Sequence, residues 1–330
     1  VKEYPTGFLS VGGVYSSVDK FVAMVDLTQA NLFGKGQYIK LRGELGGRSS
    51  FYELSFRDPW FMDKPISFGT ALYKTIRKYG NFERKATGFE VSFGKSFWEY
   101  WGASITYNYE QSTIFNVKPD ASEAVKSQQG TTTTSSITTS LGRDTRDNYL
   151  DPLRGSKNTL AMTFAGLGGT NAFYKTIFDS GWYYPLFDVT TIHLRGRIGY
   201  ATGLFGKKLP LYERYYVGGI YTVRGLGYGQ AGPIDAQSGE ALGGEKQLIF
   251  NAEYIFPIVS ELKFKGLVFF DAGRAYTTGE TLGSELRYTT GAGIRWISPV
   301  GPIRIEWGYN LDKKPGESAS KVEFTFGTFF

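Results

Sequence analysis

One arginine in a glycine-rich stretch has the most specific chemistry in this sequence. Residues 215–229 read Tyr-Tyr-Val-Gly-Gly-Ile-Tyr-Thr-Val-Arg-Gly-Leu-Gly-Tyr-Gly, and the arginine is Arg224. The glycines let the backbone turn tightly, so the guanidinium group can reach a partner. The stretch lies in the longest predicted connection, from about 204 to 244, and a long loop in a compact fold usually has a function. These residues predict anchoring rather than the making or breaking of bonds.

Residues that usually carry catalysis or bind metals are scarce. The chain has no cysteine, which excludes disulfides and thiolate chemistry. Its one histidine, His193, has no evident serine or acid partner in the sequence, and nearby Arg195 and Arg197 disfavour its charged form, so we interpret it as a residue that fills the interior. Residues 227–232 match G-x-G-x-x-G but lack the preceding strand and following helix of a dinucleotide fold. We predict no catalytic residue, no metal site, no cofactor and no enzymatic activity.

The composition is typical of a membrane wall built from strands. The 330 residues include 43 glycines and 17% aromatic residues, and the net charge is +6. The charges are scattered and form no basic stripe, so we predict no nucleic-acid partner. No run approaches the ~18 apolar residues of a transmembrane helix. Many aromatic residues and glycines with a hidden alternation are typical of a transmembrane β-barrel, and a soluble β-protein is the alternative.

Apolar and polar residues alternate along most of the chain, which is the pattern of strands with two different faces. For example, Ile39 and Leu41 alternate with Lys40 and Arg42. The aromatic residues are too many and too bulky for the interior of a soluble barrel, and they cluster near strand ends. We therefore predict that the apolar face contacts lipid and that the polar face lines a lumen.

The segments with this alternation number sixteen. Their predicted ranges are 7–16, 20–30, 36–46, 49–57, 66–78, 82–95, 98–111, 131–143, 155–166, 172–184, 190–203, 245–256, 263–275, 285–297, 301–311 and 320–330. Long connections follow odd-numbered segments, at about 112–130, 204–244, 276–284 and 312–319. One connection after an even-numbered segment, 144–154, is also long, but its Asp, Asn, Pro and Gly content is typical of a turn. Short periplasmic turns opposite long outer loops are expected of bacterial barrels. The sequence thus predicts an all-β fold, in which residues 1–330 form a single 16-stranded antiparallel transmembrane β-barrel.

Several stretches resemble the BamA-type outer-membrane insertases, whose relatives include TamA and the two-partner secretion transporters. The family's Val-Arg-Gly-Phe/Tyr motif of the sixth surface loop stands here as Val223, Arg224, Gly225 and Leu226, with leucine in place of the aromatic residue. Further similar stretches are 143–156, 211–219, 232–233 and 296–304. The resemblance covers essentially the whole chain, and the order of its parts agrees with the count of strands.

The resemblance implies that the long sixth loop folds into the lumen and that its arginine pairs with acids on neighbouring strands. The matching acids are Glu253 and Asp271, and the alternation independently places both on the polar face. Arginine suits such a pairing better than lysine does. The alternative is that Arg224 is a solvated loop charge and that the two acids are ordinary polar groups of the lumen.

The resemblance also implies a lateral gate at the seam between the first and last strands. The first strand carries three glycines, which weaken strand pairing, although glycines also permit curvature. The alternating aromatic residues at the C-terminus resemble the β-signal of outer-membrane proteins, although any last strand of a lipid-facing barrel alternates in this way. The predicted seam residues are Gly7, Phe8, Leu9, Val11, Gly12, Gly13, Phe324, Phe326, Gly327, Phe329 and Phe330.

The function that we expect is insertion of client β-barrels into the outer membrane of a Gram-negative bacterium. The expected partners are unfolded outer-membrane proteins, accessory lipoproteins and outer-membrane lipids. The family carries periplasmic POTRA domains ahead of the barrel, and we expect this chain to hold the barrel without them. The alternatives are a two-partner secretion transporter, which passes an unfolded polypeptide through the lumen, and a passive porin-like channel.

Overall fold

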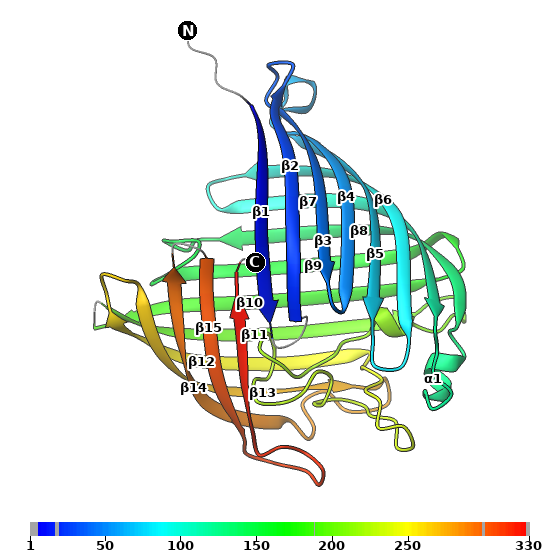
Figure 1. Cartoon of the computed structure of the whole chain (residues 1–330), viewed down its shortest axis with the longest axis vertical. Coiled ribbons are helices and arrows are strands. Elements are labelled where there is room, and N and C mark those ends of the chain that lie inside the picture. The colour runs from blue at the N-terminus through cyan, green and yellow to red at the C-terminus, as the bar shows by residue number, and fades with distance from the viewer. Residues whose placement is uncertain (1–5, 17–19, 188, 299–300, 328–330) are drawn as a thin grey trace.

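Each strand pairs with the next one along the chain, and the last strand pairs with the first, so the sheet closes into an antiparallel barrel (Figure 1). The computed structural model describes residues 6–16, 20–187, 189–298 and 301–327. The strands are β1 (Gly7–Ser16), β2 (Lys20–Leu32), β3 (Gln37–Gly46), β4 (Ser49–Asp58), β5 (Ser67–Lys78), β6 (Glu83–Phe97), β7 (Trp101–Phe115), β8 (Gly130–Asp144), β9 (Gly155–Gly169), β10 (Phe173–Leu186), β11 (Thr190–Gly203), β12 (Lys246–Val259), β13 (Phe264–Tyr276), β14 (Arg287–Ser298), β15 (Gly301–Asn310) and β16 (Ser320–Phe326). The predicted 16-stranded antiparallel barrel is confirmed.

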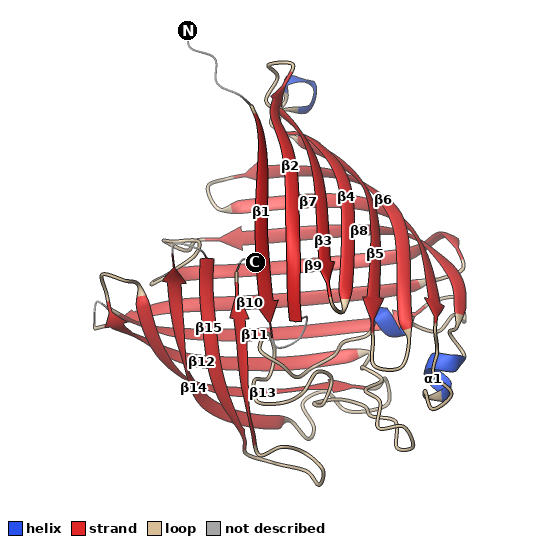
Figure 2. Cartoon of the chain, viewed as in Figure 1, coloured by secondary structure: helices blue, strands red, loops and turns tan. Residues whose placement is uncertain are grey.

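In the described parts of the connections lie three short helices, namely η1 (Phe61–Asp63), α1 (Glu123–Lys126) and η2 (Leu211–Glu213). Figure 2 shows that strands make up almost the whole wall, with the longer loops gathered at one end of the barrel. No helix among the described residues is long and apolar enough to cross a membrane.

Two strand boundaries differ clearly from the prediction. The seventh strand was expected at 98–111, but β7 runs from Trp101 to Phe115. Trp98 has a positive φ of 53° and belongs to the turn, while Phe115 still pairs with Glu83 of β6. The last strand was expected to reach 330, but β16 ends at Phe326. The predicted seam residues Phe329 and Phe330 lie outside the described residues.

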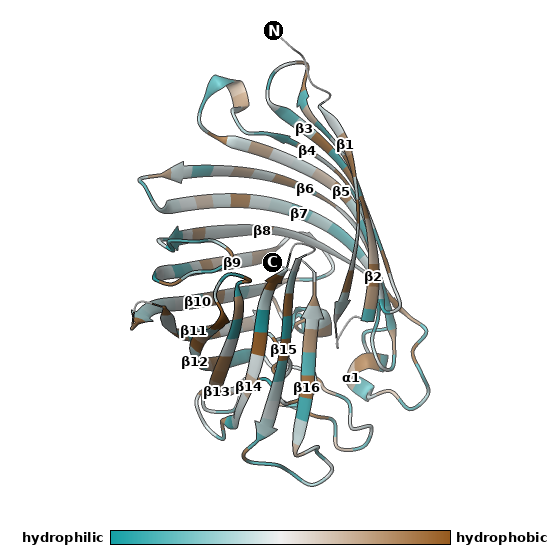
Figure 3. Ribbon diagram, turned by 60° about the vertical axis from the view of Figure 1, so that its left-hand side comes forward, coloured by the Kyte–Doolittle hydropathy of each residue, from teal (hydrophilic) through white to brown (hydrophobic). Residues whose placement is uncertain are grey.

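The two faces of the wall differ in chemistry as the alternation predicts. Leu41 of β3 and Leu54 of β4 are direct partners, and both side chains are about half exposed on the outside. The polar face of the same region carries ion pairs, such as Arg42 with Asp26 at 3.0 Å. Figure 3 shows the change between hydrophilic and hydrophobic residues along β14–β16. Because soluble proteins rarely expose such large apolar surfaces, the outer face is the one that contacts lipid.

The connection between β11 and β12 comprises residues 204–245, and we call it the Arg224 loop. Its apolar side chains form a buried cluster with residues of β9–β13, which consists of Ala165, Phe173, Ala201, Leu209, Tyr215, Val217, Val223, Leu226, Ala231, Ile249 and Ala275. A second cluster joins Leu211 of the loop to Ile114 of β7 and to Val125 of α1. The loop is thus packed against the strands around it rather than extended into solvent.

Candidate functional site

Arg224 is buried and its guanidinium group is fully engaged with carboxylates. Its Nε and Nη2 donate to the two oxygens of Asp271 at 2.7 and 2.6 Å, and its Nη1 donates to Glu253 at 2.6 Å. The same Nη1 donates to Glu306 of β15 at 3.0 Å, and the backbone N–H of Arg224 donates to Asp271 at 3.0 Å. Only 3% of the residue is exposed. The structure therefore brings the arginine together with both acids that the resemblance implied, and adds a third.

An aromatic ring completes the environment of the guanidinium group. The Cζ of Arg224 lies 3.7 Å from the ring centroid of Phe269 in β13, a distance at which cation–π attraction operates. The ring fits because Gly291 of β14 stands opposite it, where an added Cβ would lie 2.5 Å from the ring. Burial lowers the pKa of Arg224, but the surrounding carboxylates outweigh burial and raise it above its ordinary value. The arginine is therefore held as a cation.

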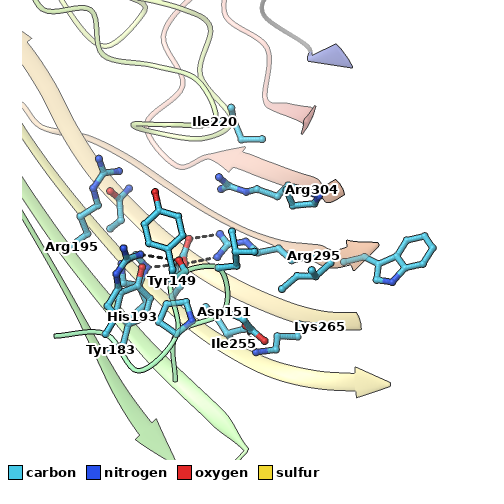
Figure 4. A pocket seen from close by; sticks show the side chains of 18 of the residues that line it. Tyr149, Asp151, Tyr183, His193, Arg195, Ile220, Ile255, Lys265, Arg295 and Arg304 are labelled. Carbon is cyan, nitrogen blue, oxygen red and sulfur yellow. Dashed lines mark hydrogen bonds and ion pairs between the residues drawn. The ribbon is translucent and has the colours of Figure 1, made fainter. Parts of the chain in front are cut away.

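Glu253 of β12 connects Arg224 to Arg295 and His193. Arg295 of β14 donates two hydrogen bonds to it, at 2.9 and 2.7 Å, and Nδ1 of His193 lies 3.0 Å from its Oε2. Figure 4 shows His193 and Arg295 at one cavity, with Ile220 of the loop at its edge. Its volume is about 340 Å³. His193 also stacks on Tyr183. Its acid partner, Glu253, was not evident in the sequence because it lies 60 residues along the chain.

Backbone contacts between glycines seat the motif Val223–Leu226 on the wall. Gly225 has a positive φ of 84°, and an added Cβ would lie 2.8 Å from the backbone of Gly308 in β15. In the same way, a Cβ on Gly308 would lie 2.6 Å from the nitrogen of Gly225. Neither position can carry a side chain without moving the loop from the strand. Leu226, which replaces the aromatic residue of the resembled motif, is fully buried in the apolar cluster, as is Val223.

The seam between β1 and β16 is the weakest strand pair among the described residues. Ten residues of β1 pair with β2, whereas only two pairs join β1 to β16, namely Tyr15 with Phe326 and Ser16 with Thr325. Figure 1 shows the C-terminal ends of β1 and β16 meeting while the strands run apart from there. The Tyr15 and Phe324 rings stack across the seam with centroids 5.1 Å apart.

The predicted seam residues of β1 lie mostly beyond these two pairs. Phe8, Leu9 and Val11 are exposed, with 73% of Val11 accessible, and no β16 partner is described for Gly7, Gly12 or Gly13. Gly327 follows β16 and lies beside β1, since a Cβ on it would approach Val14 to 3.0 Å. A long stretch of the β1 edge is therefore without a described partner strand.

Sequence reasoning missed several residues that surround the motif. Glu306 and Glu323 both face the loop, and the backbone N–H of Gly225 donates to Glu323 at 3.1 Å. The sequence could have pointed to both glutamates, because each lies on the polar face of one of the last two strands, between apolar neighbours. Gly308 also had a signal, because a glycine inside an alternating strand often marks close approach of another backbone. In the part of the chain that is described, no group of three or more potential ligands is arranged for a metal ion.

Comparison with known proteins agrees with this architecture. The Omp85 superfamily domain matches residues 31–330. The chain belongs to the Omp85 superfamily. It is 31% identical to the outer membrane protein assembly factor BamA of Nitratidesulfovibrio vulgaris, an alignment that covers 100% of this chain and 42% of that protein. This Omp85 chain thus spans less than half the length of that relative, and the same holds for BamA of Neisseria meningitidis serogroup B at 47%.

Solved structures give the same fold. BamA from Haemophilus ducreyi lacking POTRA domains 1–3 matches with a TM-score of 0.90 and 21% identity, over 98% of this chain and 70% of that chain. CdiB from Acinetobacter baumannii matches less well, with a TM-score of 0.62 and 14% identity over 98% of this chain and 59% of that chain. This Omp85 protein is a transmembrane β-barrel of the outer membrane.

Proposed function

We propose that this barrel folds client outer-membrane proteins and inserts them into the membrane at the β1–β16 seam. The observation that carries the proposal is the disparity between the two edges of β1. Ten residue pairs hold β1 to β2, and two are described between β1 and β16. An unpaired strand edge presents a row of backbone donors and acceptors, which is a template for another strand.

The mechanism is addition of a strand. The last strand of an unfolded client pairs with the free edge of β1 and gains main-chain hydrogen bonds. Leu9 and Val11 lie on the lipid-facing side of β1, as their partners Leu27 and Val25 do on β2, so a client strand that pairs there has its own apolar face in the bilayer from the start. The pairs at Tyr15 and Ser16 are few enough to break and form again as the client closes and leaves.

The ion pairs around Arg224 support a role in anchoring the loop rather than in making or breaking covalent bonds. The cations at the centre of the site are directed at carboxylates of the same chain, so the site positions the Arg224 loop. We infer that this loop, as part of a single domain, occupies the lumen and reduces its conductance. The proposed partners are client outer-membrane proteins, the lipoproteins of an assembly complex and outer-membrane lipids, consistent with the similarity to assembly factors.

A disulfide test addresses the proposal directly. The chain has no native cysteine, so Val11→Cys gives a single reporter on β1. The Val11→Cys barrel is combined with a stalled client that carries one cysteine in its last strand. We expect disulfide capture at Val11 in one register, and none at the control Leu72→Cys, which is also exposed on the outer face but lies on β5.

One result would replace the proposal with a different function. If a secreted polypeptide is captured from a lumen position such as Arg197→Cys, and no client is captured at Val11, the barrel is a secretion transporter. Capture of clients at Val11 and Leu72 alike would mean that clients contact the whole outer wall and that the seam is not their entry site.

A further inference from the structure

A buried carboxylate on the last strand contacts the Arg224 loop. Glu323 of β16 has no exposed surface, and its Oε2 accepts the hydrogen bond from the backbone N–H of Gly225 at 3.1 Å. Its Oε1 accepts no hydrogen bond from any described residue, although the Nζ of Lys321 lies 3.4 Å away. A buried carboxylate is unfavourable unless it is hydrogen-bonded. The N–H of Gly225 is therefore a principal partner of Glu323.

Glu323 also stands directly opposite a second buried carboxylate. Glu306 of β15 is its partner in the strand register, and like charges placed directly opposite destabilise a strand pair. Arg224 contributes a guanidinium group to Glu306, and Gly225 contributes its N–H to Glu323. Two consecutive residues of the motif thus compensate two opposed carboxylates, one on each strand of the last hairpin.

The contact lies next to the point where the barrel closes. Glu323 precedes by two residues Thr325, which pairs with Ser16 of β1. Between them, Phe324 stacks on Tyr15 across the seam. Any restraint on the position of Glu323 therefore acts on the segment of β16 that meets β1.

We propose that Glu323 is a positioning residue that couples docking of the Arg224 loop to closure of the seam. With the motif docked, the N–H of Gly225 fixes the carboxylate and thereby the end of β16 beside β1. When the motif leaves, water replaces the N–H, and β16 loses this restraint. Coupling of this kind is reciprocal, so a closed seam also favours the docked loop. The inference rests on the proposed function, because it names what holds the seam that clients use.

A cysteine pair measures closure of the seam without any client. Tyr15→Cys and Phe326→Cys introduce thiols at residues that are direct partners across the seam. The rate of disulfide formation is compared with and without Arg224→Ala in three backgrounds: native Glu323, Glu323→Gln and Glu323→Ala. All variants are assayed in membranes. A second pair, Leu41→Cys with Leu54→Cys, is the control at a fully paired part of the wall outside the seam.

We expect Arg224→Ala to slow formation of the seam disulfide by about fivefold or more, as is typical of coupled sites. The same slowing is expected with Glu323→Gln, because glutamine keeps an oxygen that accepts from Gly225. With Glu323→Ala the effect of Arg224→Ala falls below about twofold, because the link is gone. An equal effect of Arg224→Ala in all three backgrounds, or no effect with native Glu323, overturns the proposal. The wall pair should keep one rate throughout.

A second measurement serves if Arg224→Ala prevents folding. Val223 is fully buried, so maleimide labelling of Val223→Cys reports departure of the motif from the wall. We expect Glu323→Ala to accelerate labelling by about fivefold or more and Glu323→Gln to leave it unchanged. Labelling of the Glu323→Ala variant at the native rate contradicts the coupling. Neither measurement contains a client, so their failure leaves the capture of clients at Val11 as a separate question.

Discussion

Replacement of Arg224 with alanine removes one guanidinium group from contact with three buried carboxylates. Glu253 keeps Arg295 and His193 as partners. Glu306 keeps Arg295 of β14 and Arg304 of β15. Asp271 is different, because it has no exposed surface and loses both side-chain bonds from Arg224. It retains the amide of Asn251 at 2.8 Å and the backbone N–H of residue 224 at 3.0 Å, but no positive charge. The cost of the substitution is therefore concentrated on Asp271.

The expected loss of unfolding free energy follows from the carboxylate of Asp271, which is left without a counter-charge. Removing one partner of a buried ion pair costs about 3–5 kcal/mol, since the remaining charge stays buried without compensation. We expect Arg224→Ala to lower the free energy of unfolding by about that amount, and Asp271→Asn to recover a large part of it in the double variant. Arg224→Lys recovers less, since a single ammonium group cannot bind the two oxygens of Asp271 side by side.

The assay is equilibrium unfolding of the barrel from lipid vesicles by denaturant. Arg42→Ala is the matched control, because Arg42 also pairs with a carboxylate of the polar face, but that carboxylate, Asp26, keeps Lys40 at 2.8 Å. A partly exposed pair of this kind contributes about 0–1 kcal/mol. If Arg224→Ala and Arg42→Ala have the same small effect, or if Asp271→Asn recovers nothing, the reasoning from an orphaned charge is refuted.

Two further predictions concern the glycine contact and one outer loop. Gly308→Ala places a Cβ 2.6 Å from the nitrogen of Gly225, so we expect the free energy of unfolding to fall by about 1–3 kcal/mol. Gly43→Ala is the control and should change it little, because its Cβ would meet no atom within 4 Å. Equal effects of the two substitutions would contradict the close contact. Burial raises the pKa of Glu317 in the β15–β16 loop, but the hydrogen bond from Arg287 helps to outweigh it and the pKa falls to about 2. The ionised Glu317 therefore stabilises the folded barrel above pH 4.5, and this stabilisation is lost as the pH falls through about 2. The difference in melting temperature between the native protein and Glu317→Gln should shrink over that pH range. A difference that stays constant with pH argues against the ion pair.

The wall of the barrel could be predicted from the sequence because it depends on local alternation. Each strand repeats the same two-faced pattern, and its neighbours are adjacent in the chain, so the order of pairing follows from the count. The exceptions were at strand ends. Trp98 belongs to the turn because of its positive φ, and β7 continues to Phe115 although its alternation breaks beyond the predicted end, where Gln111 is exposed and Ile114 is buried. Turn geometry and strand length depend on contacts that a two-residue period does not contain.

The site was only partly predictable because it depends on contacts between distant segments. Glu253 and Asp271 were found through a resemblance, and no property of the residues alone distinguishes them from other acids on the polar face. Glu306 and Glu323 lie 82 and 98 residues from their partners in the motif. Their importance comes from burial by the loop, which the sequence of β15 and β16 does not reveal.

Stability alone does not explain why the loop carries buried charges. The apolar cluster around Val223 and Leu226 already packs the loop against the wall, and a buried ion pair often stabilises no more than a hydrophobic replacement of similar volume. The charges instead fix the position and orientation of the loop on the wall. A planar guanidinium group that must satisfy Asp271, Glu253 and Glu306 together admits very few positions of the backbone. One of those positions places the N–H of Gly225 on Glu323, and so the network that fixes the loop also fixes the strand at the seam.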